Sequence, residues 1–217
     1  MVNETAQTRG IGSRDAETQR LNTSLTGDKN SNLTAKVWWS SKPSFNYKIK
    51  MSLLYGTCRV DKPASLKSNT DYLTSIGTSS NPATLKASIS TTKYFMIRLS
   101  GDGWTTVGTH DFNSFLFNKK AVIYPKYYNS HCKNRCVAPY YANFAKVTNP
   151  VKWNSSTDRK NYITWYEKTY GKPSVDWAKY DIHHIRSREV GGLNDYYNLC
   201  PVIRTTHYTY SGWWNKY

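Results

Sequence analysis

The sequence contains no long apolar run. Across its 217 residues, no stretch approaches the roughly 18 consecutive apolar residues that a membrane-spanning helix requires. Residues 1–20 also lack the apolar core of a secretory signal peptide. We therefore expect no membrane span, and a chain that either is not exported by the signal-peptide route or is a piece of something longer.

Acidic residues are scarce as well. The chain has 14 Asp and Glu against 30 Lys and Arg, which gives a formal net charge of +16 at pH 7. Such an excess favours a polyanionic partner, namely nucleic acid, anionic lipid or an acidic protein, although a solvated cationic surface gives the same count. Residues 1–119 hold 15 basic and 8 acidic residues, and residues 120–217 hold 15 and 6. Charge alone therefore does not locate a site.

Cysteine is too rare for a disulfide scaffold, with four residues in the whole chain. His131, Cys132 and Cys136 resemble the start of a zinc site, but a second pair at metal-ligand spacing is missing from the sequence. A local disulfide or free thiols are the favoured interpretation, and the pairing of the cysteines stays open.

The first half of the chain has the pattern of β-structure. Residues 1–32 are polar, and we expect a flexible lead-in there. Residues 33–117 contain short alternating runs rich in β-branched and aromatic side chains, separated by Gly, Asn, Ser and Pro. This pattern predicts an antiparallel β-sandwich-like domain. It weakly resembles accessory β-sandwich domains of secreted bacterial enzymes and surface proteins, and it carries no catalytic constellation.

Residues 118–217 form the second predicted domain. Its first part, to about residue 155, is irregular and rich in tyrosines, which we expect to cover a small core, with stacking on bases as the alternative. A helix is predicted next, with a cap among residues 155–158 and an end at Gly171. The aromatic residues at helical spacing on one of its faces are Tyr162, Trp165, Tyr166 and Tyr170.

Three of the five histidines lie near the C-terminus. Residues 180–185 read as a short strand, on which alternation places His183 and His184 on opposite faces. A polar loop with two adjacent glycines, a second apolar run at residues 198–202 and a helix from about residue 204 follow. Folded compactly, this order is expected to bring one histidine of the strand opposite His207 in the first turns of the helix.

This arrangement suits phosphodiester hydrolysis. That reaction needs an activated water, charge neutralisation at phosphorus and stabilisation of the leaving oxygen. A histidine with a pKa near 6.5 serves as a general base at neutral pH. A divalent cation held by imidazoles, waters and substrate oxygens neutralises the phosphate.

The chain from about residue 159 to 217 resembles the HNH, or ββα-metal, nuclease superfamily. More narrowly, it is similar to the C-terminal nuclease domains of bacterial polymorphic toxins and to colicin-type DNases. The resemblance rests on His-His-Ile at residues 183–185, Gly-Gly at 191–192, Asn-Leu at 198–199 and the distal His207. It implies an α+β protein in which a nuclease domain (118–217) contains a ββα core at 177–217.

The resemblance also implies roles for single residues. His183 and His207 match the metal ligands, and His184 matches the general base. Asn198 matches the residue that braces the loop and helps to orient the site. For contacts to phosphate we expect first Arg188, then Arg186 and Arg204, with solvated loop charges as the alternative.

Two positions depart from the family pattern. Ser187 stands where many relatives have Pro, so the turn after the first strand is expected to be looser. Ser211 stands where colicin-type members carry a further metal ligand. We therefore expect an ion held by His183 and His207 alone, which favours exchangeable Mg²⁺ or Mn²⁺ over Zn²⁺ or Ni²⁺. Asp181 lies nearby, but the resemblance gives it no role.

Taken together, these features predict a metal-dependent endonuclease that cleaves DNA, with RNA not excluded. The resemblance implies the toxic tip of a secreted bacterial toxin, cytoplasmic before export, delivered into a target cell and blocked by an acidic immunity protein. One alternative is a basic binding module for cell wall, lipid or nucleic acid with a degenerate histidine unit. Another is a phage or restriction-type nuclease of the same superfamily.

Overall fold

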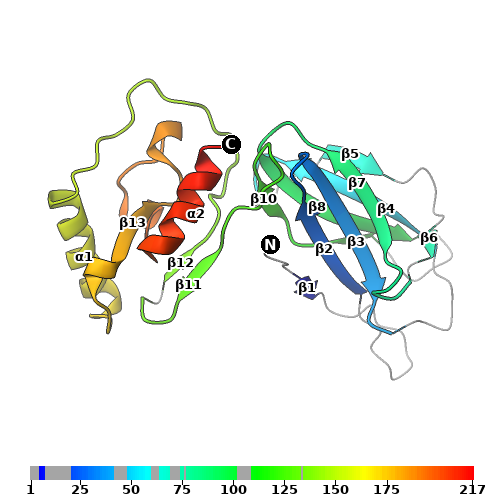
Figure 1. Cartoon of the computed structure of the whole chain (residues 1–217), viewed down its shortest axis with the longest axis horizontal. Helices are drawn as coiled ribbons and strands as arrows, with labels where there is room; N and C mark the ends of the chain where they lie inside the picture. Colours follow the sequence, from blue (N-terminus) through cyan, green and yellow to red (C-terminus); the bar gives the residue numbers. More distant parts are fainter. Residues whose placement is uncertain are drawn as a thin grey trace. The chain divides into compact units, whose positions relative to one another are not determined.

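A computed structural model of the chain describes residues 5–7, 21–41, 48–59, 64–68, 74–75, 77–101, 109–132 and 134–217. The chain divides into two compact units, residues 1–123 and residues 124–217 (Figure 1). Both helices and antiparallel sheets are present, so the predicted α+β class is confirmed.

The first unit contains two antiparallel sheets. One has the strand order β1-β2-β3-β7. Its members are β1 (Thr5–Gln7), β2 (Leu21–Gly27), β3 (Asn32–Trp39) and β7 (Ala83–Ser88). The other has the order β10-β8-β4-β5, with β6 paired to β4 and β9 paired to β8. Its members are β4 (Lys48–Gly56), β5 (Ala64–Ser68), β6 (Thr74–Ser75), β8 (Lys93–Gly101), β9 (Thr109–Asp111) and β10 (Phe115–Phe117).

One hydrophobic cluster joins the two sheets. Side chains alternate between buried and accessible along β3 and β7, as expected where one face of a sheet is covered. Leu33 and Val37 of the first sheet and Leu53 and Leu99 of the second are completely buried in the same cluster. Each such burial stabilises the fold by roughly 1.5–3 kcal/mol. The predicted pairing of two sheets over a shared core is therefore present.

Two predicted boundaries of this unit are wrong. The expected lead-in contains β2, whose Leu25 lies opposite Ala35 of β3 and is buried. Residues 1–32 are polar as a whole, but Leu21 and Leu25 of β2 belong to the core. At the other end the unit extends to residue 123, beyond the predicted limit of 117, because Ile123 forms a bridge with Phe117 and Ala121 belongs to the core.

The second unit contains two hairpins and two helices. The first hairpin pairs β11 (Tyr127–Asn129) with β12 (Asn134–Cys136), and the second pairs β13 (Tyr180–His184) with β14 (Leu199–Ile203). The helices are α1 (Thr157–Tyr170) and α2 (Arg204–Trp214). Short 3₁₀ turns cover Trp177–Lys179, Arg188–Val190 and Tyr196–Asn198. The strand, loop, strand and helix predicted from the sequence near the C-terminus are confirmed.

Asn154 begins α1. Its Oδ1 accepts hydrogen bonds from the backbone N–H groups of Ser156 and Thr157 at 3.0 and 3.1 Å. In return, Oδ2 of Asp158 accepts from the backbone N–H of Asn154 at 2.8 Å. This reciprocal arrangement satisfies donors that every helix start leaves free. The predicted helix is confirmed and its N-cap position, Ser156, lies within the predicted residues 155–158, but the side chain that accepts from the free N–H groups is that of Asn154.

The two helices cover opposite faces of the β13–β14 hairpin. Tyr162 and Tyr166 of α1 are buried against Tyr180, Ile182 and Leu199. In α2, the ring of Tyr210 lies 4.4 Å from that of His183, centroid to centroid, on the face that alternation assigns to His183. The hairpin is thus buried on both faces, and the histidine-bearing strand is held rigidly.

Candidate functional site

The three C-terminal histidines meet in one cleft of about 490 Å³. The cleft is formed by the start of α1, by β13 with the loop after it, and by α2. His183, His184 and His207 all line it, together with Arg188. The other charged or aromatic residues of its lining are Trp153, Arg159, Asp181, Glu189 and Trp214.

Tyr124 fixes the tautomer of His183. The phenol oxygen of Tyr124 lies 2.8 Å from the backbone oxygen of Ile185 and 3.3 Å from Nε2 of His183. A carbonyl oxygen only accepts, so the single phenol proton goes to Ile185. Nε2 of His183 must then donate to the phenol oxygen. The lone pair of this buried imidazole is therefore on Nδ1, and His183 lines the cleft.

Asn194 fixes the tautomer of His184 in the same way. The side-chain amide of Asn194 donates through Nδ2 to the backbone oxygen of Lys152 at 2.9 Å. Its Oδ1 is therefore the atom that lies 2.9 Å from Nε2 of His184, and the imidazole donates to it. Trp153 contacts the ring of His184 edge-on, at 5.1 Å between centroids. The lone pair of His184 is on Nδ1.

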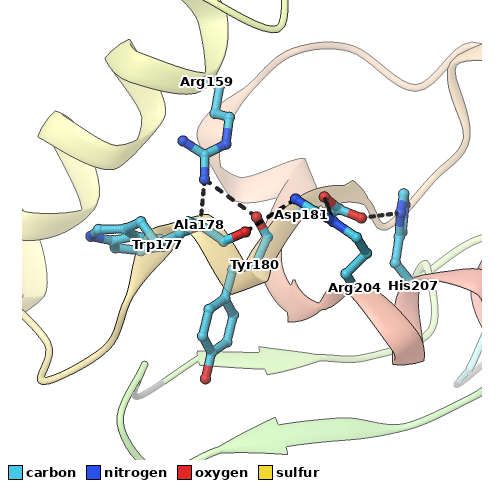
Figure 2. Close-up of polar contacts among 7 residues, drawn as sticks. All are labelled: Arg159, Trp177, Ala178, Tyr180, Asp181, Arg204 and His207. Atoms are coloured by element: carbon cyan, nitrogen blue, oxygen red, sulfur yellow. Dashed lines mark hydrogen bonds and ion pairs between the residues drawn. The ribbon is translucent and has the colours of Figure 1, made fainter.

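Asp181 holds His207. Oδ2 of Asp181 lies 3.2 Å from Nδ1 of His207, and Oδ1 lies 3.3 Å from Nε of Arg204 (Figure 2). Because the carboxylate accepts the Nδ1 proton, the neutral form of His207 has its lone pair on Nε2. Asp181 shares a face of β13 with His183, so one strand supplies both an imidazole and the group that orients a second one.

Burial keeps the histidine pair neutral. The pKa of His183 is lowered well below 6.5, first by burial and then by the nearby His207 and His184. The pKa of His184 is also lowered, mainly by burial, while the hydrogen bond to Asn194 acts in the opposite direction and Arg188 lowers it further. Both imidazoles therefore present an unprotonated nitrogen at pH 7.

The residues present fit a divalent metal ion. The rings of His183 and His207 lie 5.3 Å apart between centroids, and each uses one nitrogen in a hydrogen bond while the other keeps its lone pair. Metal-binding histidines characteristically have such an outer partner. Within the described ranges no group of three or more His, Cys, Asp or Glu side chains is arranged to hold a metal. A bound ion would thus take its remaining ligands from water and substrate.

Asn198 lies behind the cleft and closes the loop between β13 and β14. Its Oδ1 accepts from the backbone N–H of Arg186 at 2.9 Å. Its Nδ2 donates to the backbone oxygens of Arg186 and Leu193 at 3.1 and 2.8 Å. These three bonds tie the two ends of the loop together, which is the geometry that the expected bracing role requires.

The turn after β13 is held firmly despite Ser187. The backbone oxygen of Ser187 accepts from the N–H groups of Val190 and Gly192 at 3.1 and 2.9 Å. Gly191 has φ +83°, and a Cβ on Gly192 would lie 1.9 Å from the backbone oxygen of Arg186. The two glycines are therefore required by the turn. Backbone hydrogen bonds thus hold this turn, and a looser turn than Pro would give stays a prediction.

The three arginines expected to contact phosphate are placed differently. Arg188 lines the cleft and donates to the backbone oxygen of Val151. Arg186 instead donates to the backbone oxygen of Val190, and its guanidinium lies over the ring of Phe144. Arg204 pairs with Asp181 and does not line the cleft. The structure thus brings only Arg188 of this set to the histidines.

Several residues of the site were not assigned from the sequence: Tyr124, Trp153, Arg159, Asp181 and Asn194. For Asp181 a signal existed, because strand alternation places it on the face of His183. The others come from distant segments or from the loop, and no local periodicity marks them.

The cysteine region does not resemble a metal site in the structure. Cys132, Cys136 and Cys200 are buried free thiols of the second unit, and burial raises the pKa of Cys132 to about 11. The ring of His131 lies against Oδ1 of Asn129 at 3.3 Å. The zinc alternative therefore gains no support in the described part of the chain.

Comparisons of the chain with protein-family models, with curated proteins and with solved structures find no match. Among the described residues, no helix is both long enough and apolar enough to cross a membrane. What the site does must therefore be argued from its geometry and from the sequence motif.

Proposed function

We propose that the second unit is a metal-dependent endonuclease of the HNH, ββα-metal type, which hydrolyses phosphodiester bonds in DNA. One observation carries the proposal. The neutral imidazole of His184, with its Nδ1 lone pair fixed by Asn194, lies in the same cleft as His183 and His207, whose lone pairs are also fixed. The sequence motif assigns these three histidines to base and ligand roles in the same order.

His184 is the general base. Its Nε2–H is held by Asn194, so Nδ1 receives the proton of the attacking water. Its lowered pKa keeps that nitrogen free at neutral pH. Trp153 restricts the ring from the side, so that the base is oriented before the substrate arrives. The proton leaves the site when the imidazolium is deprotonated by solvent.

His183 and His207 would hold one divalent cation, with Mg²⁺ or Mn²⁺ favoured over Zn²⁺ or Ni²⁺. When bound, such an ion neutralises the phosphate charge and stabilises the leaving oxygen. Tyr124 and Asp181 keep the two imidazoles in the tautomers that ligation requires. Arg188 supplies a cation for a phosphate oxygen, and the excess of basic residues supplies sequence-independent affinity for DNA.

The biological setting follows from the resemblance alone. The nuclease unit would be the toxic tip of a secreted bacterial toxin delivered into a target cell, and the first unit would be a delivery or binding module. An acidic immunity protein would cover the cleft. The competing readings are a non-catalytic basic module and a phage or restriction-type nuclease.

Plasmid cleavage tests the proposal. Purified wild-type protein is incubated with supercoiled plasmid in Mg²⁺, in Mn²⁺ and in EDTA, beside His184→Ala and the matched control His131→Ala. His131 lies in the same unit but outside the cleft. We expect metal-dependent nicking by wild type and control, and none by His184→Ala. Binding of plasmid without any cleavage would instead support the non-catalytic module.

A further inference from the structure

Arg159 is a cleft residue without a role in the sequence motif. It stands in the first turn of α1 and is partly buried. Its Nη2 donates to the backbone oxygens of Trp177 and Tyr180, at 2.5 and 3.3 Å (Figure 2). Trp177 begins the 3₁₀ turn that leads into β13 and Tyr180 is the first residue of β13, so the guanidinium is fixed to the start of the strand that carries the histidine pair.

Among the residues that the structure describes, no carboxylate forms an ion pair with Arg159. Asp181 is the acidic residue next to Tyr180, but its two oxygens are already engaged by Arg204 and His207. Glu189 also lines the cleft and forms no ion pair with Arg159. Backbone carbonyls orient the guanidinium without neutralising it, and an arginine stays protonated at any physiological pH.

Arg159 shares this pattern with Arg188, whereas two other arginines are paired with carboxylates. Arg98 in the first unit makes a two-pronged ion pair with Asp111, and Arg204 pairs with Asp181. Arg159 has one amino group held by carbonyls, which leaves Nε and Nη1 as donors. Its guanidinium is oriented by carbonyls, keeps its charge and lines the same cleft as the proposed general base. Such an arginine is suited to bind an anionic oxygen of a ligand.

We propose that Arg159 binds a phosphate oxygen of the nucleic-acid substrate, at or next to the bond that His184 hydrolyses. The inference rests on the proposed function, because the nuclease reading makes the anion a phosphodiester. Arg159 and Arg188, each fixed by a backbone carbonyl, then supply two cations from two different segments to the same cleft.

The salt dependence of DNA binding tests this contact directly. Binding of a short DNA duplex is measured by fluorescence anisotropy in the His184→Ala background, in EDTA, between about 50 and 200 mM salt. Each phosphate contact contributes about 0.9 to the slope of log affinity against log salt concentration. We expect Arg159→Gln to weaken binding and to reduce the magnitude of that slope by about one.

Lys160→Gln is the matched control. It removes the same charge one residue further along the same helix, at an exposed position outside the cleft. We expect its slope to equal that of the parent. An unchanged slope in folded Arg159→Gln, or an equal loss in Lys160→Gln, would overturn the proposal.

A second variant covers the case in which Arg159→Gln does not fold. Arg159→Lys keeps the charge but replaces the fixed fork by a mobile point charge. We expect it to retain the slope and to bind DNA about 10-fold more weakly; unchanged affinity would refute the contact. If the wild-type protein does not cleave plasmid, the proposed nuclease function is rejected. The salt dependence of DNA binding then still decides whether Arg159 contacts a phosphate.

Discussion

The two units carry the same formal charge but very different chemistry. Residues 1–123 have 16 basic and 8 acidic side chains, and residues 124–217 have 14 and 6, so each unit is at +8. The first unit is built on aliphatic side chains between two sheets. The second holds four of the five histidines and buries His183 among aromatic rings. Net charge therefore does not distinguish the units, whereas buried titratable groups with fixed partners mark the second unit as the one with the candidate site.

Hydrogen bonding separates the units in the same way. In the first unit, the ion pair between Arg98 and Asp111 lies near the surface. In the second unit, Tyr124, Asn194 and Asp181 each fix one imidazole. Surface ion pairs contribute little to stability, whereas partners of a buried imidazole decide which nitrogen it presents. Substitutions in the second unit should therefore change function far more than those in the first.

Removal of the proposed base, His184, should have the largest effect. His184→Ala is expected to lower the rate of plasmid cleavage by about 10²–10⁴, the usual contribution of a general base. Asp111→Asn, in the first unit, removes one partner of the exposed ion pair and should leave the rate within about twofold, since such pairs contribute little. Initial rates of nicking under identical metal concentrations provide the measurement. Equal losses in the two variants would end the functional distinction between the units.

The second-largest effect is expected from Asp181, whose carboxylate accepts a hydrogen bond from His207. Asp181→Asn removes the charge that holds Nδ1 of His207, and loss of such an outer partner typically costs about 10–100-fold in metal affinity. Titration of Mn²⁺ by calorimetry measures this directly, without reference to activity. Asp176→Asn is the control, because Asp176 caps the turn before β13 and Asn caps equally well. Identical Mn²⁺ affinities in the two variants would show that Asp181 does not support a ligand.

The sequence predicted those parts of the site that follow a local period. Strand alternation separates His183 from His184, and the aromatic spacing in residues 162–170 marks a helix with one buried face. Both elements are present. The same rule places Asp181 on the face of His183, although the family pattern gives Asp181 no role.

The remaining site residues depend on packing between distant segments. Tyr124 reaches His183 across 59 positions, and Arg159 reaches Tyr180 across 21. Neither contact leaves a periodic signal in the chain. The prediction of a flexible lead-in at residues 1–32 is wrong for a related reason. Leu25 is buried because β3 lies beside it, and the local sequence does not show that neighbour. Local pattern gives the elements, but these tertiary partners require the structure.

Tyr124→Phe should destabilise the second unit moderately. It leaves the backbone oxygen of Ile185 and Nε2 of His183 without their partner in a buried place, which costs about 1–3 kcal/mol. Tyr128→Phe removes the same atom from a side chain that is 60% exposed, and should stay within about 0.5 kcal/mol of wild type. Urea unfolding provides both values. A difference near zero between the variants would mean that the phenol does not hold His183.

The smallest expected effect is a difference between the two units in the pH range over which each loses stability. The pKa of His183 is lowered in the folded state, so the folded protein resists a proton that the unfolded chain accepts. Its stabilising contribution is complete above about pH 6.5 and declines as the pH falls below that value.

Asp28, in the turn between β2 and β3, also has a lowered pKa, but in a more acidic range. Hydrogen bonds led by the backbone N–H of Asn32 lower its pKa from 3.8 to about 2.

For Asp28 the stabilising contribution is present above about pH 4 and is lost as the pH falls towards 2. Amide hydrogen exchange resolves the two ranges, because it reports on each unit separately. We expect protection in β13 to decline first, below about pH 6.5, while protection in β2 and β3 declines only below about pH 4. Asp28→Asn should abolish the second decline and leave the first. Simultaneous loss in both units would show that burial of a neutral histidine does not distinguish them.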